Sequence, residues 1–482
     1  MLMVPIVIAH LGVEGYGLWA IIMAMVAYMR FGSAGIKSAF QKYVAEATGS
    51  GDFDKTNKLL STGTVAISLL SILGLVPVAL FSTSLARAIK VPVHFLVSTS
   101  DAISCLAVIT ILSNIGAVYE AIIMGGHRID LVRQFSIVRV VVECLVIILC
   151  LYMGYGLFSM AVVMAISEFG YIACCYVASA RILPQIRINK NYVTRTVIPE
   201  LIRFVGSYQL VNVLEFIYVA ILPVTILKLF GAQASGVYAI CDRLVGAALL
   251  FQSALLPPLI SGGSMVFALG SEERRRLLVH KTFKATFALT LPPLVFLSAF
   301  GTTIIMAWTG QSDPSFPSAL WLLCTAGFFQ AFSLVGLVLY RTAGGTLMDI
   351  VRQSIRILTI LFIIILGKQW AYLSLLTGLA VAEFLGMIFM LFAVAKFTSF
   401  SAKTLIVDTL KIASIVINIL VLSMIVENLI EPVGTNARFT AVLKLGGVTL
   451  TALVALWPAL FLTKYMSTAE VRVMLNVFTR HR

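Results

Sequence analysis

The stretch "LGVEGYGLWAI", Leu11–Ile21, decides the fold of this chain because a second stretch repeats its pattern. That second stretch, "FGAQASGVYAI", is Phe230–Ile240 and lies 219 residues further along the sequence. One short match has little weight, so the same offset must recur elsewhere before it indicates a duplication. The identities that the two stretches share are Gly12/Gly231, Gly17/Gly236, Ala20/Ala239 and Ile21/Ile240.

The same offset recurs in the loops. "GGHRIDLVRQ" at 125–134 aligns with "GGTLMDIVRQ" at 344–353, and "GDFDK" at 51–55 aligns with "GSEER" at 270–274. Further on, "SEF" at 167–169 resembles "AEF" at 382–384 with the offset slipped by four. We therefore predict an internal duplication. Its copies are residues 1–204 and 205–400, followed by residues 401–482 as two added transmembrane helices and a cytosolic tail.

The composition places both copies in a membrane. The 482 residues are 60% hydrophobic, have a mean hydropathy of +1.02 and include only 12% charged residues, against about 25% in a soluble domain. A helix needs roughly 20 apolar residues to cross the bilayer, and backbone groups in lipid must bond within their own segment. Alternating ten-residue strands of a membrane barrel are absent from the sequence. The predicted spans are 16–36, 59–81, 101–124, 134–153, 156–180, 205–229, 235–262, 285–308, 318–343, 353–367, 369–395, 405–426 and 441–463.

These spans predict an all-α, polytopic membrane protein of 14 helices if the short apolar segment "MLMVPIVIAH" at 1–10 counts as the first. That segment is about half the length needed to cross, and we expect a truncated first helix. It has neither the basic region nor the cleavage site of a signal peptide. Six helices in each copy return the chain to the same side, so the two copies are predicted to be parallel repeats around a central cavity.

The formal net charge of +14 follows the predicted topology. Most of the 35 lysines and arginines fall in the loops after even-numbered helices or in the tail, and a basic bias of this kind marks the cytosolic side. We therefore expect both termini in the cytosol, and we assign the basic balance to topology rather than to nucleic acid. Six basic residues fall on the opposite side: Arg87, Lys90, Lys228, Lys368, Arg438 and Lys444.

The cysteines and histidines indicate neither a cofactor nor a metal. All seven cysteines fall inside apolar spans without a C-x-x-C spacing, and a buried free cysteine behaves as a small hydrophobe. The five histidines lie at span ends or in loops. We expect no disulfide, no metal site, no cofactor and no catalytic residue.

Together, "LGVEGYGLWAII" at 11–22, "FGSAGIKSAFQKYVAEATGSGDFDKTNKLL" at 31–60 and "GAQASGVYAICDRL" at 231–244, followed by two prolines, resemble Wzx-type polysaccharide flippases. These belong to the multidrug/oligosaccharidyl-lipid/polysaccharide (MOP) exporter superfamily. The resemblance covers residues 1–400 and implies two six-helix lobes around a cavity lined by predicted helices 1, 2, 7 and 8. It also implies a polyprenyl-diphosphate-linked oligosaccharide as substrate, with a polymerase and glycosyltransferases of the same pathway as partners. The short first helix departs from this pattern.

Ionisable residues within spans indicate a cavity or an interhelical contact, because a charge at the bilayer centre costs about 3 kcal/mol on insertion scales. The predicted helix 205–229 carries one polar stripe on an otherwise apolar surface. We place this stripe on the cavity wall, with interhelical hydrogen bonding as the alternative. The stripe consists of Tyr208, Asn212, Glu215 and Tyr218.

Arginines on the paired predicted helices 16–36 and 235–262 are candidates for the diphosphate. Guanidinium groups bind phosphate through bidentate, charge-assisted hydrogen bonds, so Arg30 and Arg243 fit this role, with Arg203 at the cytosolic mouth. The alternative is that each pairs with a carboxylate. Asp242 does not face Arg243 on one helix, since consecutive residues point apart. The negative charges of Asp242 and Glu215 would nearly cancel the positive charges of Arg30 and Arg243, so the cavity would be almost neutral.

Other charged positions indicate scaffold. Arg139 and Glu143 have the four-residue spacing of a helical ion pair. Glu168 and Glu383 are related by the repeat, and we favour interhelical contacts for them over proton sites. Glycine pairs in the 125–134 and 344–353 loops suit tight turns or helix C-caps, and no phosphate-binding loop pattern surrounds them.

Two other functions compete with a flippase in the inner membrane. One is a cation-coupled exporter of drugs or small metabolites, which carboxylates alone would favour. The other is an integral membrane polysaccharide polymerase, which would need larger loops with clustered acid and base groups. The absence of an ATP-binding motif leaves an ion gradient, or removal of the substrate, as the source of energy.

Overall fold

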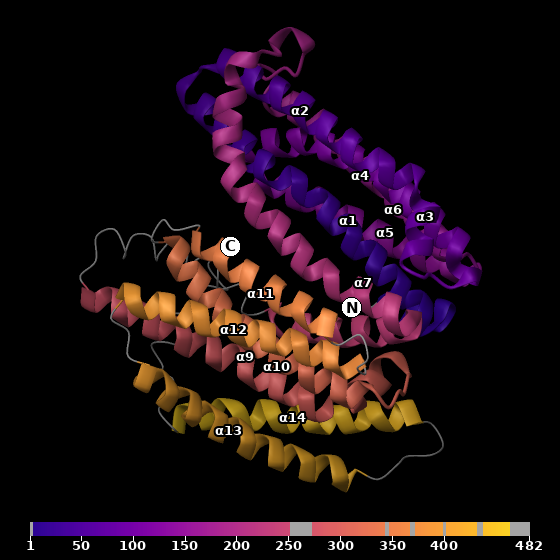
Figure 1. The fold of residues 1–482 in the computed structure, drawn as a ribbon, viewed down its shortest axis with the longest axis vertical. Coiled ribbons are helices and arrows are strands. Elements are labelled where there is room, and N and C mark those ends of the chain that lie inside the picture. Colours follow the sequence, from indigo (N-terminus) through magenta and orange to yellow (C-terminus); the bar gives the residue numbers. More distant parts are fainter. Residues whose placement is uncertain are drawn as a thin grey trace. The chain divides into compact units, whose positions relative to one another are not determined.

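The structure is a computed structural model that describes residues 3–250, 272–342, 347–366, 372–398, 402–430 and 437–462. These residues form α-helices joined by short loops, with two 3-10 turns at Lys190–Tyr192 and Arg195–Val197 (Figure 1). The all-α architecture of a polytopic membrane protein that the sequence predicted is confirmed. The helices are α1 (Met3–Ser50), α2 (Phe53–Leu80), α3 (Ser82–Ala88), α4 (Val93–Gly125), α5 (Ile129–Tyr152), α6 (Leu157–Ile182), α7 (Ile198–Ala248), α9 (Glu272–Thr309), α10 (Phe316–Thr342), α11 (Leu347–Leu366), α12 (Tyr372–Thr398), α13 (Ala402–Leu429) and α14 (Ala437–Leu462).

Nine helical stretches within the described residues are long and apolar enough to cross a membrane. They include α2, α4, α5, α6, α9 and most of α12, as well as parts of α1, α7 and α10. Large apolar side chains are exposed along them, as on Leu70 and Leu73 of α2 and Phe392 of α12. Apolar surface of this extent is stable in lipid rather than in water. The chain is a multi-pass membrane protein.

Both long helices α1 and α7 contain a sharp break at a glycine. Gly12 has φ 71° and ψ 174°, and Gly231 has φ 85° and ψ 177°. Glycine adopts a positive φ without the steric penalty that a Cβ imposes, so each position ends one helix and starts the next. Gly12 and Gly231 are the first matched glycines of the sequence repeat. The repeat therefore preserves the two positions at which the chain changes direction.

The helices pack as two compact units, Met1–Ala239 and Ile240–Arg482. In the first, α4 is central and packs against α1, α2 and α6. The core of this packing is apolar and includes Phe40, Val44, Leu59 and Ile122. The division by contacts falls inside α7 and does not test the duplication boundary at 204/205, which stays a prediction.

In the second unit, α10 packs against α9 and α12, and α12 also packs against α11. A cluster of aromatic rings from α9 and α10 fills its core, with Phe283 and Phe287 facing Phe332. The added helices α13 and α14 pack against each other and against α9. Figure 1 shows these two helices as the yellow pair beside α9.

The segment 183–197, which leads from α6 to α7, is tied along α2 by side-chain to backbone hydrogen bonds. Asn57 Nδ2 donates to the Gln185 carbonyl oxygen at 3.2 Å, and Asn57 Oδ1 accepts from the Arg187 backbone N–H at 2.9 Å. Thr62 Oγ1 accepts from the Thr194 backbone N–H at 3.0 Å and donates to its carbonyl at 3.3 Å. Two side chains thus satisfy backbone groups that a loop would otherwise leave to water. We call this hydrogen-bonded segment, residues 183–197, the strap.

Candidate functional site

The centre of the candidate site is a contact between repeat-related glycines of α1 and α7. A Cβ atom on Gly17 would lie 2.5 Å from the backbone nitrogen of Gly236 and 2.9 Å from the carbonyl oxygen of Ala232. A Cβ atom on Gly236 would overlap the carbonyl oxygen of Val13. Val13 and Ala232 are themselves related by the repeat offset. The contact is therefore reciprocal between the two matched stretches of sequence.

This contact explains why the repeat carries a second glycine in each copy. Small residues let the backbones of membrane helices approach closely, because lipid gives apolar side chains no reason to cluster. At Gly17 and Gly236 the backbones approach so closely that no side chain fits between them. Each glycine lies five residues after the break at Gly12 or Gly231, so one short motif supplies both the turn and the close contact.

The predicted polar stripe lies on one continuous part of α7. Glu215 is half-buried and Tyr218 is buried, with 5% of its surface exposed. Tyr208, Asn212 and the nearby Arg203 are on α7 as well, but their side chains lie outside the described residues. The assignment of this stripe to a substrate cavity stays a prediction.

The two candidate arginines are on the helices that carry the glycine contact. Arg30 is on α1, and its side chain lies outside the described residues. Arg243 and its neighbour Asp242 are both exposed on α7, beyond the break at Gly231. Glu215 belongs to the first compact unit, whereas Asp242 and Arg243 belong to the second. Their role in binding a diphosphate stays a prediction.

The expected pair between Arg139 and Glu143 is not the one that forms. Arg139 Nη1 instead donates to Glu168 Oε2 on α6, and the guanidinium lies 5.3 Å from the centre of the Tyr171 ring. Ser113 Oγ of α4 donates to the other oxygen, Oε1, of Glu168 at 2.7 Å. A neighbouring helix thus supplies a nearer partner than the next turn of the same helix. Three helices meet at Glu168, which agrees with its prediction as an interhelical contact.

The second unit contains a related pair at the repeat-related carboxylate. Arg356 Nη2 of α11 donates to Glu383 Oε1 of α12, and both side chains are buried. Arg352, one turn earlier, donates to Ser333 Oγ of α10 at 3.2 Å and is also buried. Arg356 lies in α11, as the predicted span 353–367 implied, and Arg352 lies one turn before it in the same helix. Their spacing with Asp349, at three and seven residues along one helix face, was the signal for a buried polar stripe.

The glycine pair at 125–126 was expected to form a tight turn or a helix C-cap. Gly126 is the C-cap residue of α4, as the glycine pair predicted. A Cβ on Gly125 would lie 2.5 Å from Val44 Cβ, so α4 and α1 also meet closely there. Glu120 of α4 pairs with Lys37 of α1. The second glycine pair, at 344–345, lies outside the described residues.

Within the described part of the chain, no cluster of three or more His, Cys, Asp or Glu side chains is arranged to hold a metal ion. The seven cysteines are free thiols. What the site offers chemically is a set of hydrogen-bonding and charged groups on helices, with close backbone contacts between those helices. Such an arrangement can bind and guide a polar molecule.

Comparison with known proteins gives one family. The sequence matches the family described as polysaccharide biosynthesis protein over residues 9–312. Comparison with curated proteins yields no sequence match.

Similar folds occur among solved structures of MOP superfamily transporters. An inward-facing multidrug resistance MATE family transporter matches with a TM-score of 0.69 and 13% identity, over 83% of this chain and 94% of that one. The lipid II flippase MurJ in an inward closed conformation matches with a TM-score of 0.67 and 15% identity, over 93% and 94%. A MOP superfamily transporter from Pyrococcus furiosus matches with a TM-score of 0.57 and 13% identity, over 83% and 94%. At these identities the likeness concerns the fold.

Proposed function

The chain belongs to the polysaccharide biosynthesis protein family, and from this premise we propose that it is a flippase. It moves polyprenyl-diphosphate-linked oligosaccharide units across the inner membrane for the synthesis of O-antigen, capsule or exopolysaccharide. The observation that carries the proposal is the family match over residues 9–312, which extends from the first repeat well into the second. The proposed partners are the lipid-linked glycan, membrane lipid, and the polymerase and glycosyltransferases that use the same lipid carrier.

The physical problem for such a protein is the polar headgroup of its substrate. Each sugar hydroxyl that enters lipid without a hydrogen bond costs roughly 2–7 kcal/mol, so a glycan needs a polar route. In our proposal, Asn212, Glu215 and the tyrosines of the α7 stripe form hydrogen bonds with sugar. The guanidinium groups of Arg30, Arg203 and Arg243 bind the diphosphate, because their planar N–H pairs match phosphate oxygens. Asp242 and Glu215 keep this binding weak enough for release.

In this proposal the reciprocal glycine contact is the point about which access alternates. The atoms nearest to Gly17 and Gly236 are mainly backbone atoms, so the two helices can separate with little rearrangement of side chains at that point. Parallel repeats suit alternating access because the two halves can exchange equivalent positions around one axis. Both termini are proposed to be cytosolic.

Complementation tests the function and the arginines together. Cells that lack their own flippase should regain surface polysaccharide when they express this chain. Arg30→Ala and Arg243→Ala should each lower the polysaccharide level, and the double variant should abolish it. The lysine variants should retain part of the activity, since lysine keeps the charge but loses the planar geometry. Glu215→Gln tests whether an ionised group is needed at the stripe or only a hydrogen-bonding one.

Arg181→Ala is the matched control, because Arg181 is an exposed arginine in the last turn of α6, outside the candidate site. Protein levels are compared by blot. Full activity of the double alanine variant at a normal protein level would refute the assignment of the arginines. Failure of the unaltered chain to restore any polysaccharide, in hosts that make different glycans, would refute the flippase itself.

A second candidate is supported by the fold similarity to a multidrug resistance transporter. A cation-coupled exporter would use Glu215 and Asp242 to exchange a cation for a drug. Expression in drug-sensitive cells distinguishes the two functions. An exporter would raise resistance to cationic drugs and would lose that effect in Glu215→Gln, whereas a flippase would leave resistance unchanged.

A further inference from the structure

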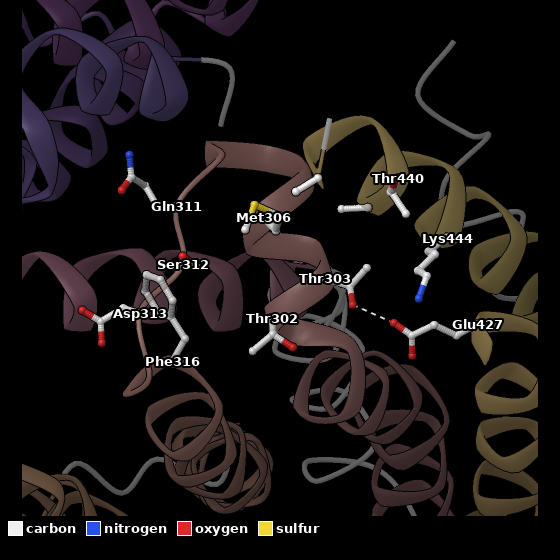
Figure 2. A pocket seen from close by; sticks show the side chains of 12 residues that line it. Thr302, Thr303, Met306, Gln311, Ser312, Asp313, Phe316, Glu427, Thr440 and Lys444 are labelled. Atoms are coloured by element: carbon white, nitrogen blue, oxygen red, sulfur yellow. Dashed lines mark hydrogen bonds between the residues drawn. The ribbon is translucent and has the colours of Figure 1, made fainter. Parts of the chain in front are cut away.

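A separate cavity of about 500 Å³ lies within the second unit, between the added helices and the core of that unit. It is bounded by the C-terminal ends of α9 and α13 and the N-terminal ends of α10 and α14 (Figure 2). All four ends belong to the side of the membrane that the charge distribution predicts to be non-cytosolic. No residue of the candidate transport site lines this cavity.

Hydrogen bonds between helices hold the walls of this cavity in place. Thr303 Oγ1 of α9 donates to Glu427 Oε1 of α13 at 2.7 Å. Arg438 of α14 donates to the carbonyl oxygens of Ala307 and Trp308, at 3.2 Å and 2.9 Å. These carbonyls are in the last turn of α9, where no helical N–H reaches them and a guanidinium is a favourable partner. The added pair of helices is therefore fixed to α9 at the level of the cavity.

The cavity carries two opposite charges that do not bond to each other. Lys444 of α14 and Glu427 of α13 are both half-buried and both line it. Figure 2 shows Thr303, Glu427 and Lys444 along one wall. Among the described residues, Lys444 forms neither an ion pair nor a hydrogen bond, and Glu427 accepts its hydrogen bond from the Thr303 hydroxyl. A third charged residue, Asp313, also lines the cavity. Its Oδ1 accepts a hydrogen bond from the Ser315 N–H at 2.9 Å, at the start of α10.

Separated opposite charges facing one cavity match a ligand that carries both charges itself. A phosphate would accept charge-assisted hydrogen bonds from the Lys444 ammonium, and an amine would donate them to the Glu427 carboxylate. The lining also includes apolar Met306 and Phe316 and the polar residues Thr302, Gln311, Ser312 and Thr440. A purely anionic ligand would meet the Glu427 charge, and a purely cationic one would meet Lys444.

The surroundings of the cavity favour a lipid over a soluble zwitterion. Leu429, at the end of α13, is 74% exposed, and Phe439, near the start of α14, is 50% exposed. Large apolar side chains therefore flank the same end of the hairpin, where acyl chains would lie beside them. We propose that this cavity binds the headgroup of a phospholipid with a primary amine, of the phosphatidylethanolamine type, in the non-cytosolic leaflet. This proposal does not depend on the flippase function.

Lipid retention by the purified full-length chain tests the proposal. The protein in detergent is exposed to equal amounts of phosphatidylethanolamine, phosphatidylcholine and phosphatidylglycerol, and the bound lipid is counted by native mass spectrometry. We expect phosphatidylethanolamine to be retained about tenfold more than either of the other lipids. This ratio corresponds to the net free energy of about one charge-assisted hydrogen bond. Phosphatidylcholine has the same charges but no N–H donor, and phosphatidylglycerol has no cation.

The variants Lys444→Met and Glu427→Gln should each abolish this preference. Glutamine keeps an oxygen that accepts from Thr303, so Glu427→Gln removes the charge while preserving the link to α9. Lys411→Met is the control, because Lys411 is an exposed lysine on the same hairpin that does not line the cavity. Equal retention of the three lipids by the unaltered chain, or an unchanged preference in Lys444→Met, would overturn the proposal. Competition by soluble phosphoethanolamine at the same concentration as the lipid would overturn the lipid as occupant.

Discussion

At the scale of single residues, the contact between Gly17 and Gly236 leaves no room for one methyl group. The neighbouring atoms belong to the backbone and cannot move aside as a flexible side chain would. We predict that Gly17→Ala lowers the free energy of unfolding by about 1–3 kcal/mol, the usual cost of overpacking. The same variant should also lower transport, since the helices can no longer close on each other. Chemical unfolding of the purified protein measures the first effect.

Gly74→Ala is the matched control for that variant. Gly74 is also inside a transmembrane helix, but a Cβ there would meet no atom within 4 Å. Alanine is the better helix former by up to about 1 kcal/mol, so this variant should be neutral or slightly stabilising. If both variants behave alike, the close contact between α1 and α7 has no energetic significance.

The buried pair between Arg356 and Glu383 gives a second prediction at this scale. Replacement of either residue by methionine leaves the other charge buried without its partner, which costs about 3–5 kcal/mol in soluble proteins. Replacement of both by methionine removes both charges, and such apolar replacements are often neutral. We therefore expect the double variant to be more stable than either single variant. Additive losses in a double-mutant cycle of unfolding would show that the two side chains are not coupled.

At the scale of elements, the strap 183–197 should depend on its anchors in α2, which are Asn57, Ser61 and Thr62. Asn57→Ala removes both hydrogen bonds to the strap at Gln185 and Arg187. We predict that limited trypsin digestion of the purified protein then cuts the strap several-fold faster at its exposed basic residues, because a segment must leave its anchors to enter a protease. These residues are Arg187, Lys190 and Arg195.

Asn418→Ala is the control for the strap. Asn418 is exposed on α13, and its Nδ2 donates within the same helix, to the carbonyl of Ser414 at 2.7 Å. Its removal should leave cleavage in the strap at the rate of the unaltered chain. An equal rate in Asn57→Ala would mean that the bonds to Asn57 do not hold the strap.

At the scale of the whole molecule, the charge distribution predicts one orientation. Accessibility tags inserted in the 181–204 segment and at 264–284 should report the cytosol, and a tag at 309–317 should report the opposite side. The reason is that short basic loops remain on the cytosolic side during insertion. A reversed result for any one of the three tags would refute the predicted orientation and, with it, the side assigned to the lipid cavity.

The sequence by itself determined the elements of this protein. Runs of apolar residues fixed the spans, because a bilayer accepts few other segments. The recurrence of Gly12 and Gly17 at Gly231 and Gly236 indicated the internal duplication, and the structure adds that the first glycine of each pair breaks a helix, where a positive φ favours glycine. These signals are local, so a single chain shows them.

Only the tertiary structure decided which charged residues meet. Spacing along one helix pointed Arg139 to Glu143, whereas the fold brings it to Glu168 on the neighbouring helix. It also buries Arg356 of α11 against Glu383 of α12. The cavity between α9 and the added hairpin has no sequence signature, because only helix packing brings Glu427 and Lys444 into the lining of one cavity. An ion pair depends on distances between helices, and the periodicity of one helix carries no information about its neighbour.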